Sequence, residues 1–298
     1  MKFQIDHATR SIDSLNGRPT EGELSTMHSG STYLSAAPFL KWAGGKRWLC
    51  QRHGHIFPNN FSKYIEPFLG SAAVYFCLQP KEAYLSDSNL RLIECYRQIM
   101  INHGEIHQIL QNYQRLHSKQ FYYEARSAVF EDPIIRAAQF IYLNRTCWNG
   151  LYRVNKNGAF NVPIGTKNCV LFPYDDFGEV SRRLFPAHIS DDDFEDSIDH
   201  GETNDFIFVD PPYTVKHNLN GFVKYNQTIF SWDDQLRLKN SLDRAVKRGA
   251  NFLMTNANHH SIKELYSAYR QMPVDRTSIL SGDPSYRSAT KELIITSW

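Results

Sequence analysis

The chain has 298 residues, of which 42% are hydrophobic, and a net charge of +2, so it holds enough apolar side chains for one large domain or two small ones. No uninterrupted apolar stretch has the length of a membrane span, and residues 1–37, rich in Ser, Thr, Gly and His, lack the apolar core of a signal peptide. We therefore expect a cytoplasmic protein with no membrane partner, in which residues 1–37 form a disordered arm.

The cysteines and histidines do not predict a metal site. The five cysteines show no CxxC spacing, which is typical of reduced thiols inside the cell. His259 and His260 are adjacent but have no thiol or carboxylate partners at ligand spacing. We interpret them as surface histidines and expect no metal cofactor.

Charge is segregated along the chain. Residues 24–65 and 133–174 contain basic but no acidic residues, whereas acidic residues dominate positions 175–205. Two basic stretches beside an acidic one are typical of a surface that binds a polyanion. The alternative is that these stretches are ordinary solvated faces.

The first ordered segment begins at Pro38 and contains Gly44 and Gly45, followed by Lys46. Glycines let the backbone approach a ligand closely, and Lys46 would lie beside that ligand. The spacing of a Walker loop is missing, which argues against ATP. A simple turn is the alternative, although it does not account for the flanking Trp42.

A predicted strand at residues 63–66 leads through a turn containing Gly70 into an apolar helix. A second predicted strand ends at Asp87, at the distance where an acid binds ribose hydroxyls in Rossmann-like sheets. A dinucleotide site has three glycines where this turn has one. The pattern therefore favours a cofactor with a ribose but no phosphates.

Residues 91–114 and 118–144 have helical periodicity and are interpreted as a helical insertion. Residues 144–165 then predict a β-hairpin, because Asn155 to Gly158 have the composition of a hairpin turn. The hairpin is free of acidic residues and has the composition of a segment that enters a DNA groove.

An apolar run at residues 206–209 predicts a buried strand, followed directly by Asp210, Pro211, Pro212 and Tyr213. Ligands bind at the carboxyl ends of strands in open α/β sheets, and the two prolines make this loop rigid. The Asp210 carboxylate and the Pro211 carbonyl are two acceptors that suit the two protons of an NH₂ group. The Tyr213 ring suits stacking on the base that carries the amine. The alternative is a strand that merely ends in a proline turn.

The remaining chain continues the same pattern. We predict a helix from Ser231 to about Arg248, a strand from Asn251 to Thr255 and a last apolar strand from Glu292 to Trp298. Strands that alternate with helices favour an α/β fold.

The motifs follow one another in the order FLKWAGGK, EPFLG, LSD, NRTCWNGLYRVNKNGAFNVPIG, DPPY and YRSATKELIITSW. In this order they resemble the Dam-type adenine-N6 DNA methyltransferases, the α-group or D12 class, over residues 38–298. The resemblance implies a Rossmann-like S-adenosylmethionine-dependent sheet with helices on both faces, formed by residues 38–90 and 166–298. Residues 91–165 would be an inserted helical and β-hairpin target-recognition domain.

The resemblance also implies roles for individual residues. S-adenosylmethionine would be held by residues from several segments: Trp42, Lys46, Glu66, Phe68, Gly70, Asp87 and Asp210. A flipped adenine would be surrounded by the tetrapeptide Asp210, Pro211, Pro212 and Tyr213. Double-stranded DNA would be bound by the hairpin: Trp148, Asn149, Leu151, Arg153 and Lys156. If that run is extended, Asn149, Leu151 and Arg153 share one face.

The implied reaction is site-specific methyl transfer to N6 of adenine in DNA. Three alternatives stay open: a methyltransferase acting on cytosine N4, one acting on protein glutamine, and a catalytically silent DNA-binding module on the same fold. The glutamine enzymes usually begin the tetrapeptide with Asn and lack a basic insertion, so Asp210 and the hairpin favour adenine. A separately encoded restriction endonuclease is a candidate partner, and GATC is the candidate site. One departure is Ala72, which replaces a usual glycine and is expected to crowd the methionine end of the cofactor.

Overall fold

The computed structural model describes residues 38–155, 158–216, 230–277 and 289–298. Every described residue lies in one compact unit, residues 35–298. The predicted arm at residues 1–37 and Lys156 of the predicted hairpin lie outside the described residues.

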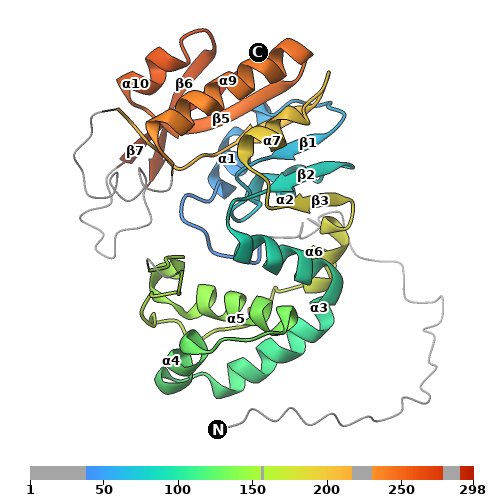
Figure 1. Cartoon of the computed structure of the whole chain (residues 1–298), viewed down its shortest axis with the longest axis vertical. Helices are drawn as coiled ribbons and strands as arrows, with labels where there is room; N and C mark the ends of the chain where they lie inside the picture. The colour runs from blue at the N-terminus through green and yellow to red at the C-terminus, as the bar shows by residue number, and fades with distance from the viewer. Residues whose placement is uncertain (1–37, 156–157, 217–229, 278–288) are drawn as a thin grey trace, which may run out of the picture. The chain divides into compact units, whose positions relative to one another are not determined.

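Seven strands of the described chain form one sheet in the order β3-β2-β1-β4-β5-β7-β6 (Figure 1). They are β1 (Tyr64–Glu66), β2 (Ala83–Ser86), β3 (Ala187–Ser190), β4 (Phe206–Val209), β5 (Asn251–Ala257), β6 (Arg270–Thr277) and β7 (Ala289–Thr296). Strands β1 to β5 are parallel, and β7 runs antiparallel between β5 and β6. The strand order reverses between β1 and β4. Ligands of α/β sheets bind outside the carboxyl ends at such a reversal.

The strands predicted from the sequence at the positions of β1, β2, β4, β5 and β7 are confirmed. Strands β3 and β6 are absent from the predicted set. Strand β3 lies within the acidic stretch, and β6 carries Arg270, Pro273 and Asp275. Because β6 is an edge strand, it tolerates a proline and polar residues. Its sequence therefore lacks the apolar run from which the other strands were predicted.

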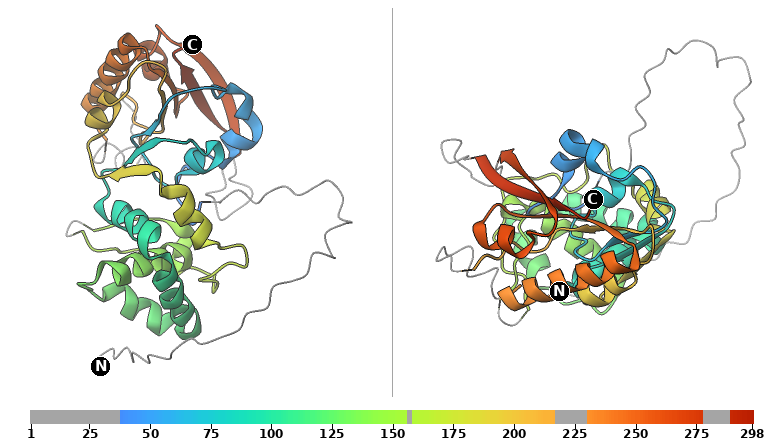
Figure 2. Two further views of the ribbon diagram at one scale, coloured as in Figure 1. Left: turned by 90° about the vertical axis from the view of Figure 1, so that its right-hand side faces the viewer. Right: turned by 90° about the horizontal axis from the view of Figure 1, so that it is seen from above.

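Helices cover both faces of the sheet, as the fold class predicts (Figure 2). Helices α7 (Phe194–Asp199) and α9 (Trp232–Arg248) lie on one face, and α1 (Arg47–His53) and α2 (Ala73–Leu78) lie on the other. All four residues of β4 are buried. Phe206 and Phe208 join the core of the α1 and α2 side, whereas Ile207 and Val209 join the core of the α7 and α9 side. The continuous apolar run of β4 therefore reflects burial on both faces.

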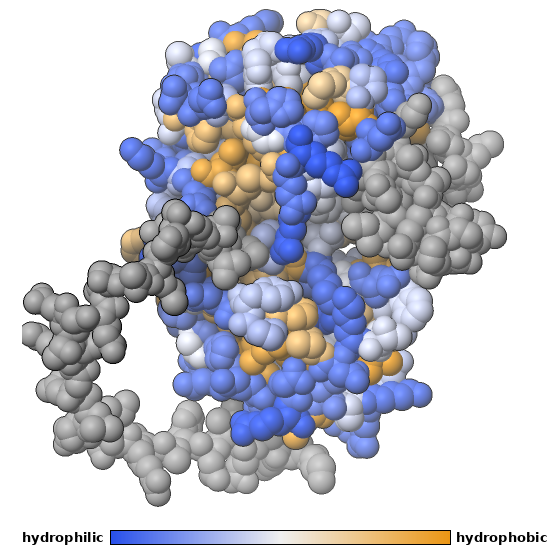
Figure 3. Space-filling model, turned by 180° about the vertical axis from the view of Figure 1, so that it is seen from behind, coloured by the Kyte–Doolittle hydropathy of each residue, from blue (hydrophilic) through white to orange (hydrophobic). Residues whose placement is uncertain are grey.

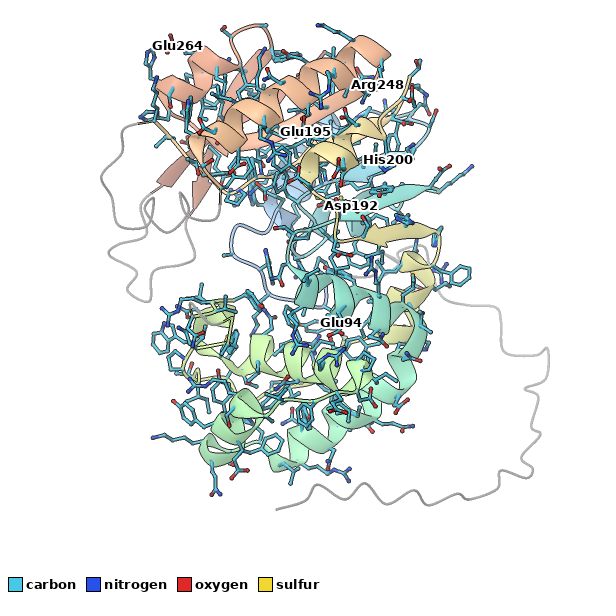
Figure 4. All side chains as sticks on the ribbon, in the orientation of Figure 1. Glu94, Asp192, Glu195, His200, Arg248 and Glu264 are labelled. Atoms are coloured by element: carbon cyan, nitrogen blue, oxygen red, sulfur yellow. The ribbon has the colours of Figure 1, made fainter. Side chains whose placement is uncertain are left out.

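Helix α9 begins at the predicted cap. The Ser231 side chain accepts from the Asp234 backbone, the Asp234 carboxylate accepts from the Ser231 backbone, and Gly249 ends the helix in a left-handed conformation. Ion pairs also join α9 to α7, with Glu195 and Arg248 at their interface in Figure 4. These pairs are partly exposed, so the apolar face of α9 supplies most of its attachment.

Three helices precede the predicted hairpin: α3 (Leu90–Leu116), α4 (Lys119–Ser127) and α5 (Pro133–Thr146). They confirm the helical ranges predicted at 91–114 and 118–144, with a break between α4 and α5. Helix α3 packs along α5 and contacts α6 (Phe177–Leu184). The compact unit 35–298 contains these helices and the sheet, and the insertion limits 91 and 165 remain a prediction.

Three further short helices occur in the described ranges: η1 (Gly54–Ile56), η2 (Trp148–Gly150) and α10 (His260–Leu265). Seen from behind, the surface is mostly hydrophilic, with smaller hydrophobic areas between (Figure 3). No helix in the described ranges is both long and apolar enough to cross a membrane.

Candidate active site

The predicted tetrapeptide lies at the carboxyl end of β4, at the reversal of strand order. Asp210 follows Val209 directly, Pro211 is buried, and Pro212 and Tyr213 are half-buried. The Asp210 side chain is 20% exposed, so its carboxylate remains accessible at the edge of the sheet. The fold therefore places this loop where the sequence predicted it.

Lys46 meets the tetrapeptide directly. It caps α1, and its ammonium nitrogen Nζ lies 2.8 Å from Asp210 Oδ2 and donates to the Gly44 carbonyl at 2.7 Å. The same nitrogen lies 5.3 Å from the centre of the Tyr213 ring. The structure thus brings Lys46 to the carboxylate of the tetrapeptide, a contact that the cofactor role predicted for Lys46 did not anticipate.

Two residues outside the predicted set complete this cluster. The Thr255 hydroxyl donates to Asp210 Oδ1 at 2.7 Å, and the Tyr213 hydroxyl donates to Glu292 Oε2 at 2.9 Å. Thr255 lies in β5 and Glu292 in β7, the next strands beyond β4. The only sequence signal for Glu292 is an acid directly before the apolar run Leu293, Ile294 and Ile295.

The cluster sets the electrostatics of Asp210. Burial raises the pKa of the Asp210 carboxyl above its usual value, while the Lys46 ammonium and the hydrogen bond from Thr255 act in the opposite direction. Burial also raises the pKa of Tyr213 well above its usual value, so its phenol is a neutral donor. A carboxylate acceptor and a flat neutral ring therefore lie side by side.

A second group of predicted residues lies in the loop between β1 and α2 and directly after β2, where Asp87 is the first residue past the strand. Asp87 Oδ2 accepts from the Gly70 backbone at 3.0 Å, and Asp87 Oδ1 accepts from the Asn89 backbone at 3.0 Å. The Tyr96 hydroxyl donates to the Gly70 carbonyl at 3.0 Å. Each Asp87 oxygen keeps a second lone pair, so the residue can fix the loop and accept from a ligand hydroxyl.

Trp42 covers this loop. Gly70 has a φ of +47°, and a side chain there would approach Trp42 Cδ1 to 2.8 Å. The Trp42 ring stacks on Tyr152 with centroids 5.6 Å apart. Gly70 is therefore required both for its left-handed backbone and for the close approach of Trp42.

Glu66, Phe68 and Ala72 are buried to different degrees in the same region. Glu66 is buried and accepts from the Tyr64 hydroxyl at 2.9 Å, and burial raises its pKa well above the usual value. Phe68 is half-buried and stacks on Phe194. Ala72 is fully buried in the core with a φ of +53°, a conformation that favours the glycine usual in the resembling family.

The hairpin forms, but its first residues are not extended. Val154 pairs with Phe160 across the predicted turn. Asn149 lies within η2 in a left-handed conformation, so the alternating arrangement expected for Asn149, Leu151 and Arg153 is wrong at Asn149. Trp148 is 48% exposed, whereas Leu151 packs against the core. Arg153 is exposed, and its Nε donates to Asn161 Oδ1 at 2.8 Å.

Helix α5 attaches the first segment to this region through Asn144 and Arg145, which the sequence did not single out as site residues. Asn144 exchanges two hydrogen bonds with the Lys41 backbone, at 2.8 and 2.7 Å. The buried Arg145 guanidinium donates to the Phe39 carbonyl and pairs with Asp175. Across the described residues, no cluster of His, Cys, Asp or Glu could hold a metal ion.

The sheet order and the tetrapeptide at its reversal agree with the α/β methyltransferase fold that the motifs predict. The family model of the D12 class N6 adenine-specific DNA methyltransferases matches residues 42–280, well over half of the chain. The protein belongs to this family and is an adenine-specific DNA methyltransferase.

Three of the similar proteins come from two bacteria and an archaeon. Type II methyltransferase M1.LlaDCHI of Lactococcus lactis subsp. cremoris is 32% identical over 274 residues, 89% of this chain and 96% of the relative. Type II methyltransferase M.MjaIII of Methanocaldococcus jannaschii is 35% identical, over 75% of this chain and 85% of the relative. The DNA adenine methylase of Haemophilus influenzae is 29% identical, over 88% of this chain and 93% of the relative.

Proposed function

We propose that Asp210, Pro211 and Tyr213 hold the target adenine while its N6 receives the methyl group of S-adenosylmethionine. The observation that carries this proposal is the position of the Asp210 carboxylate, beside the Tyr213 ring and at the carboxyl end of β4. Pro212, between them, keeps the loop rigid. The family gives the reaction, and this geometry supports the assignment of roles.

The amine of adenine is a poor nucleophile because its lone pair is delocalised into the ring. Hydrogen bonds from its two protons to the Asp210 carboxylate and the Pro211 carbonyl favour a pyramidal nitrogen and orient the lone pair. The Tyr213 ring would stack on the flipped base and offset part of the few kcal/mol that flipping costs. These residues act by positioning and electrostatics, without a covalent enzyme intermediate.

The loop between β1 and α2 fits S-adenosylmethionine, which supplies an electrophilic methyl group. Asp87 would accept from the ribose hydroxyls with the lone pairs that the backbone contacts leave. Trp42, Glu66, Phe68 and Gly70 would line the remaining pocket. The loop offers one glycine and no phosphate cradle, which agrees with a cofactor that carries no phosphates.

Duplex DNA would meet the hairpin. Trp148 is the proposed wedge that fills the space left by the flipped base, since nearly half of this side chain is exposed. Asn149 and Arg153 would contact base edges. Leu151, packed against the core, would support them from behind. The GATC target, a cytoplasmic location and a separately encoded restriction endonuclease as partner belong to the same proposal.

Two Asp210 variants test the proposal. Asp210→Asn and Asp210→Ala should abolish transfer of labelled methyl groups to unmethylated duplex DNA, while DNA binding stays near normal because affinity arises from the basic stretches. A melting curve close to that of the unsubstituted protein is the required control. Near-normal turnover in Asp210→Ala would reject the role of the carboxylate. Binding of duplex DNA without methyl transfer by the unsubstituted protein would favour the silent DNA-binding module.

A further inference from the structure

Glu292 is a buried carboxylate that the roles proposed above leave without a function. Its side chain is 1% exposed, and the next residues of β7 are buried and apolar: Leu293, Ile294 and Ile295. A buried carboxylate costs solvation free energy unless partners offset it. Two residues of the candidate active site approach it: Tyr213 donates to Oε2 at 2.9 Å, and Lys46 Nζ lies 3.8 Å from the same oxygen.

The Lys46 ammonium therefore lies between two carboxylates at unequal distances. It is 2.8 Å from Asp210 Oδ2 and 3.8 Å from Glu292 Oε2. The Gly44 carbonyl accepts from the same ammonium. Rotation about the side-chain bonds of Lys46 would bring its ammonium closer to Glu292 than to Asp210.

Binding of adenine creates a competition at Asp210. The ammonium is a stronger donor than the neutral amine, because hydrogen bonds from charged groups are shorter and stronger. While Lys46 stays on Oδ2, it neutralises the carboxylate that the amine needs. A second carboxylate within reach lowers the cost of moving the ammonium away.

We propose that Glu292 is a positioning residue for methyl transfer, which takes over the Lys46 ammonium when adenine binds Asp210 and fixes the Tyr213 ring through its phenol. This inference rests on the roles proposed above for Asp210 and Tyr213. It assigns to β7 a part in the reaction that neither the tetrapeptide nor the cofactor loop supplies.

The charged and polar groups that face Asp210 predict how the pH dependence of methyl transfer changes when one of the charges is removed. Among the described residues they are Lys46 before α1, Glu66 in β1, Tyr213 in the same loop as Asp210, Thr255 in β5 and Glu292 in β7. The negative charge of Glu292 raises the pKa of Asp210, and the Lys46 ammonium lowers it. Removing each charge should therefore move the acidic limb of the pH–rate profile in opposite directions.

The experiment measures single-turnover methyl transfer to a duplex with a target adenine, at saturating cofactor, across a pH series. Glu292→Gln keeps the size of the side chain and an acceptor for the phenol but removes the charge. We expect the rate constant to fall by about 10- to 100-fold, the range of a hydrogen bond to a charged group. The acidic limb should shift to lower pH, whereas KM for DNA and cofactor should change by less than about threefold, because the interaction acts on the chemical step.

Glu264→Gln is the matched control, since Glu264 lies on α10 with a side chain that is 77% exposed (Figure 4). It should leave both the rate and the pH profile unchanged. Unsubstituted protein and Asp210→Asn are assayed in parallel to test the proposed function itself. If the former is active and the latter inactive, an unchanged rate or an unmoved acidic limb in Glu292→Gln overturns the role of Glu292 alone.

A double variant tests the transfer of the ammonium. If Glu292 acts through Lys46, Lys46→Met combined with Glu292→Gln should lose less activity than the product of the two single losses. A loss equal to that product would overturn the coupling. If Glu292→Gln does not fold, Tyr213→Phe tests the contact with the phenol, because it keeps the ring and removes the hydroxyl. It should slow transfer by about tenfold with normal DNA binding, and an unchanged rate would contradict the inference.

Discussion

Replacing Gly70 by Ala should damage both the stability of the protein and its cofactor site. Gly70 has a φ of +47°, a conformation that costs an alanine about 1–2 kcal/mol. The added methyl group would lie 2.8 Å from Trp42 Cδ1, so the indole must move, and such overpacking costs about 1–3 kcal/mol. Alanine also reduces the conformational entropy of the unfolded chain, which stabilises the folded state by about 0.4–1 kcal/mol. The net loss should be about 2–4 kcal/mol.

The substitution should also weaken cofactor binding, because the N–H and the carbonyl of Gly70 are both hydrogen-bonded. Its N–H donates to Asp87 and its carbonyl accepts from Tyr96, so a displaced loop disturbs both contacts. Equilibrium unfolding in urea measures the change in free energy. Calorimetry with S-adenosylmethionine measures the affinity, which we expect to fall at least about tenfold, as 1.4 kcal/mol of lost binding energy would give.

Gly104→Ala is the control for this prediction. Gly104 lies within α3, and no atom lies within 4 Å of a Cβ placed there. A helical glycine costs about 1 kcal/mol relative to alanine, so this variant should be more stable than the unsubstituted protein and bind cofactor normally. Equal unfolding free energies for the two variants, or normal stability and affinity in Gly70→Ala, would refute the reasoning.

Three other substitutions test single contacts. Ala72→Gly should change stability by less than about 1 kcal/mol, because relief of the left-handed strain offsets the lost buried methyl group. Because Ala72 is fully buried in the core, we expect cofactor KM not to change. A several-fold lower KM would instead support the crowding of the cofactor that the sequence predicted. Asp87→Asn should raise cofactor KM by about tenfold, since it keeps only one side-chain acceptor; unaltered calorimetric binding would make Asp87 purely structural. Arg153→Ala should reduce the DNA-binding free energy by about 1–3 kcal/mol for duplexes with the preferred base at one position of the site. Lys156→Ala should weaken binding to all DNA sequences alike and reduce by about one unit the slope of the logarithm of the binding constant against the logarithm of salt concentration. Methylation rates on duplexes substituted at each position distinguish the two, and an equal loss at every position in Arg153→Ala would exclude base reading.

Strands that consist of continuous apolar runs were predicted correctly from the sequence, and two strands without such a run, β3 and β6, were missed. β4 is buried on both faces and reads as an unbroken run, so its limits were predicted to the residue. β3 is only four residues long, while β6 is an edge strand that contains a proline and several charged residues. Neither strand carries a signal that separates it from a loop.

The same limit applies to the candidate site. Asp210 and Tyr213 were predicted because the tetrapeptide is continuous in sequence and follows a strand. Thr255 and Glu292 reach it only because β5 lies next to β4 in the sheet and β7 lies next to β5, and this strand order does not follow from the order in the chain. The contact between Lys46 and Asp210 likewise joins segments that are far apart in sequence. Sequence patterns identify such residues one at a time, and the fold decides which of them meet.

The arrangement around Asp210 also accounts for a carboxylate, rather than a neutral acceptor, at this position. The amine nitrogen is neutral before the reaction and gains positive charge as the methyl group arrives. A carboxylate beside it therefore attracts the nitrogen more strongly in the transition state than in the ground state, which is the condition for accelerating the chemical step. An ammonium held 2.8 Å from Asp210 would cancel much of that attraction, whereas the same ammonium beside Glu292 would leave it intact. Lys46 can thus keep Asp210 ionised before adenine binds. After adenine binds, the Asp210 carboxylate can act on the amine alone, provided that the second carboxylate, Glu292, binds the ammonium.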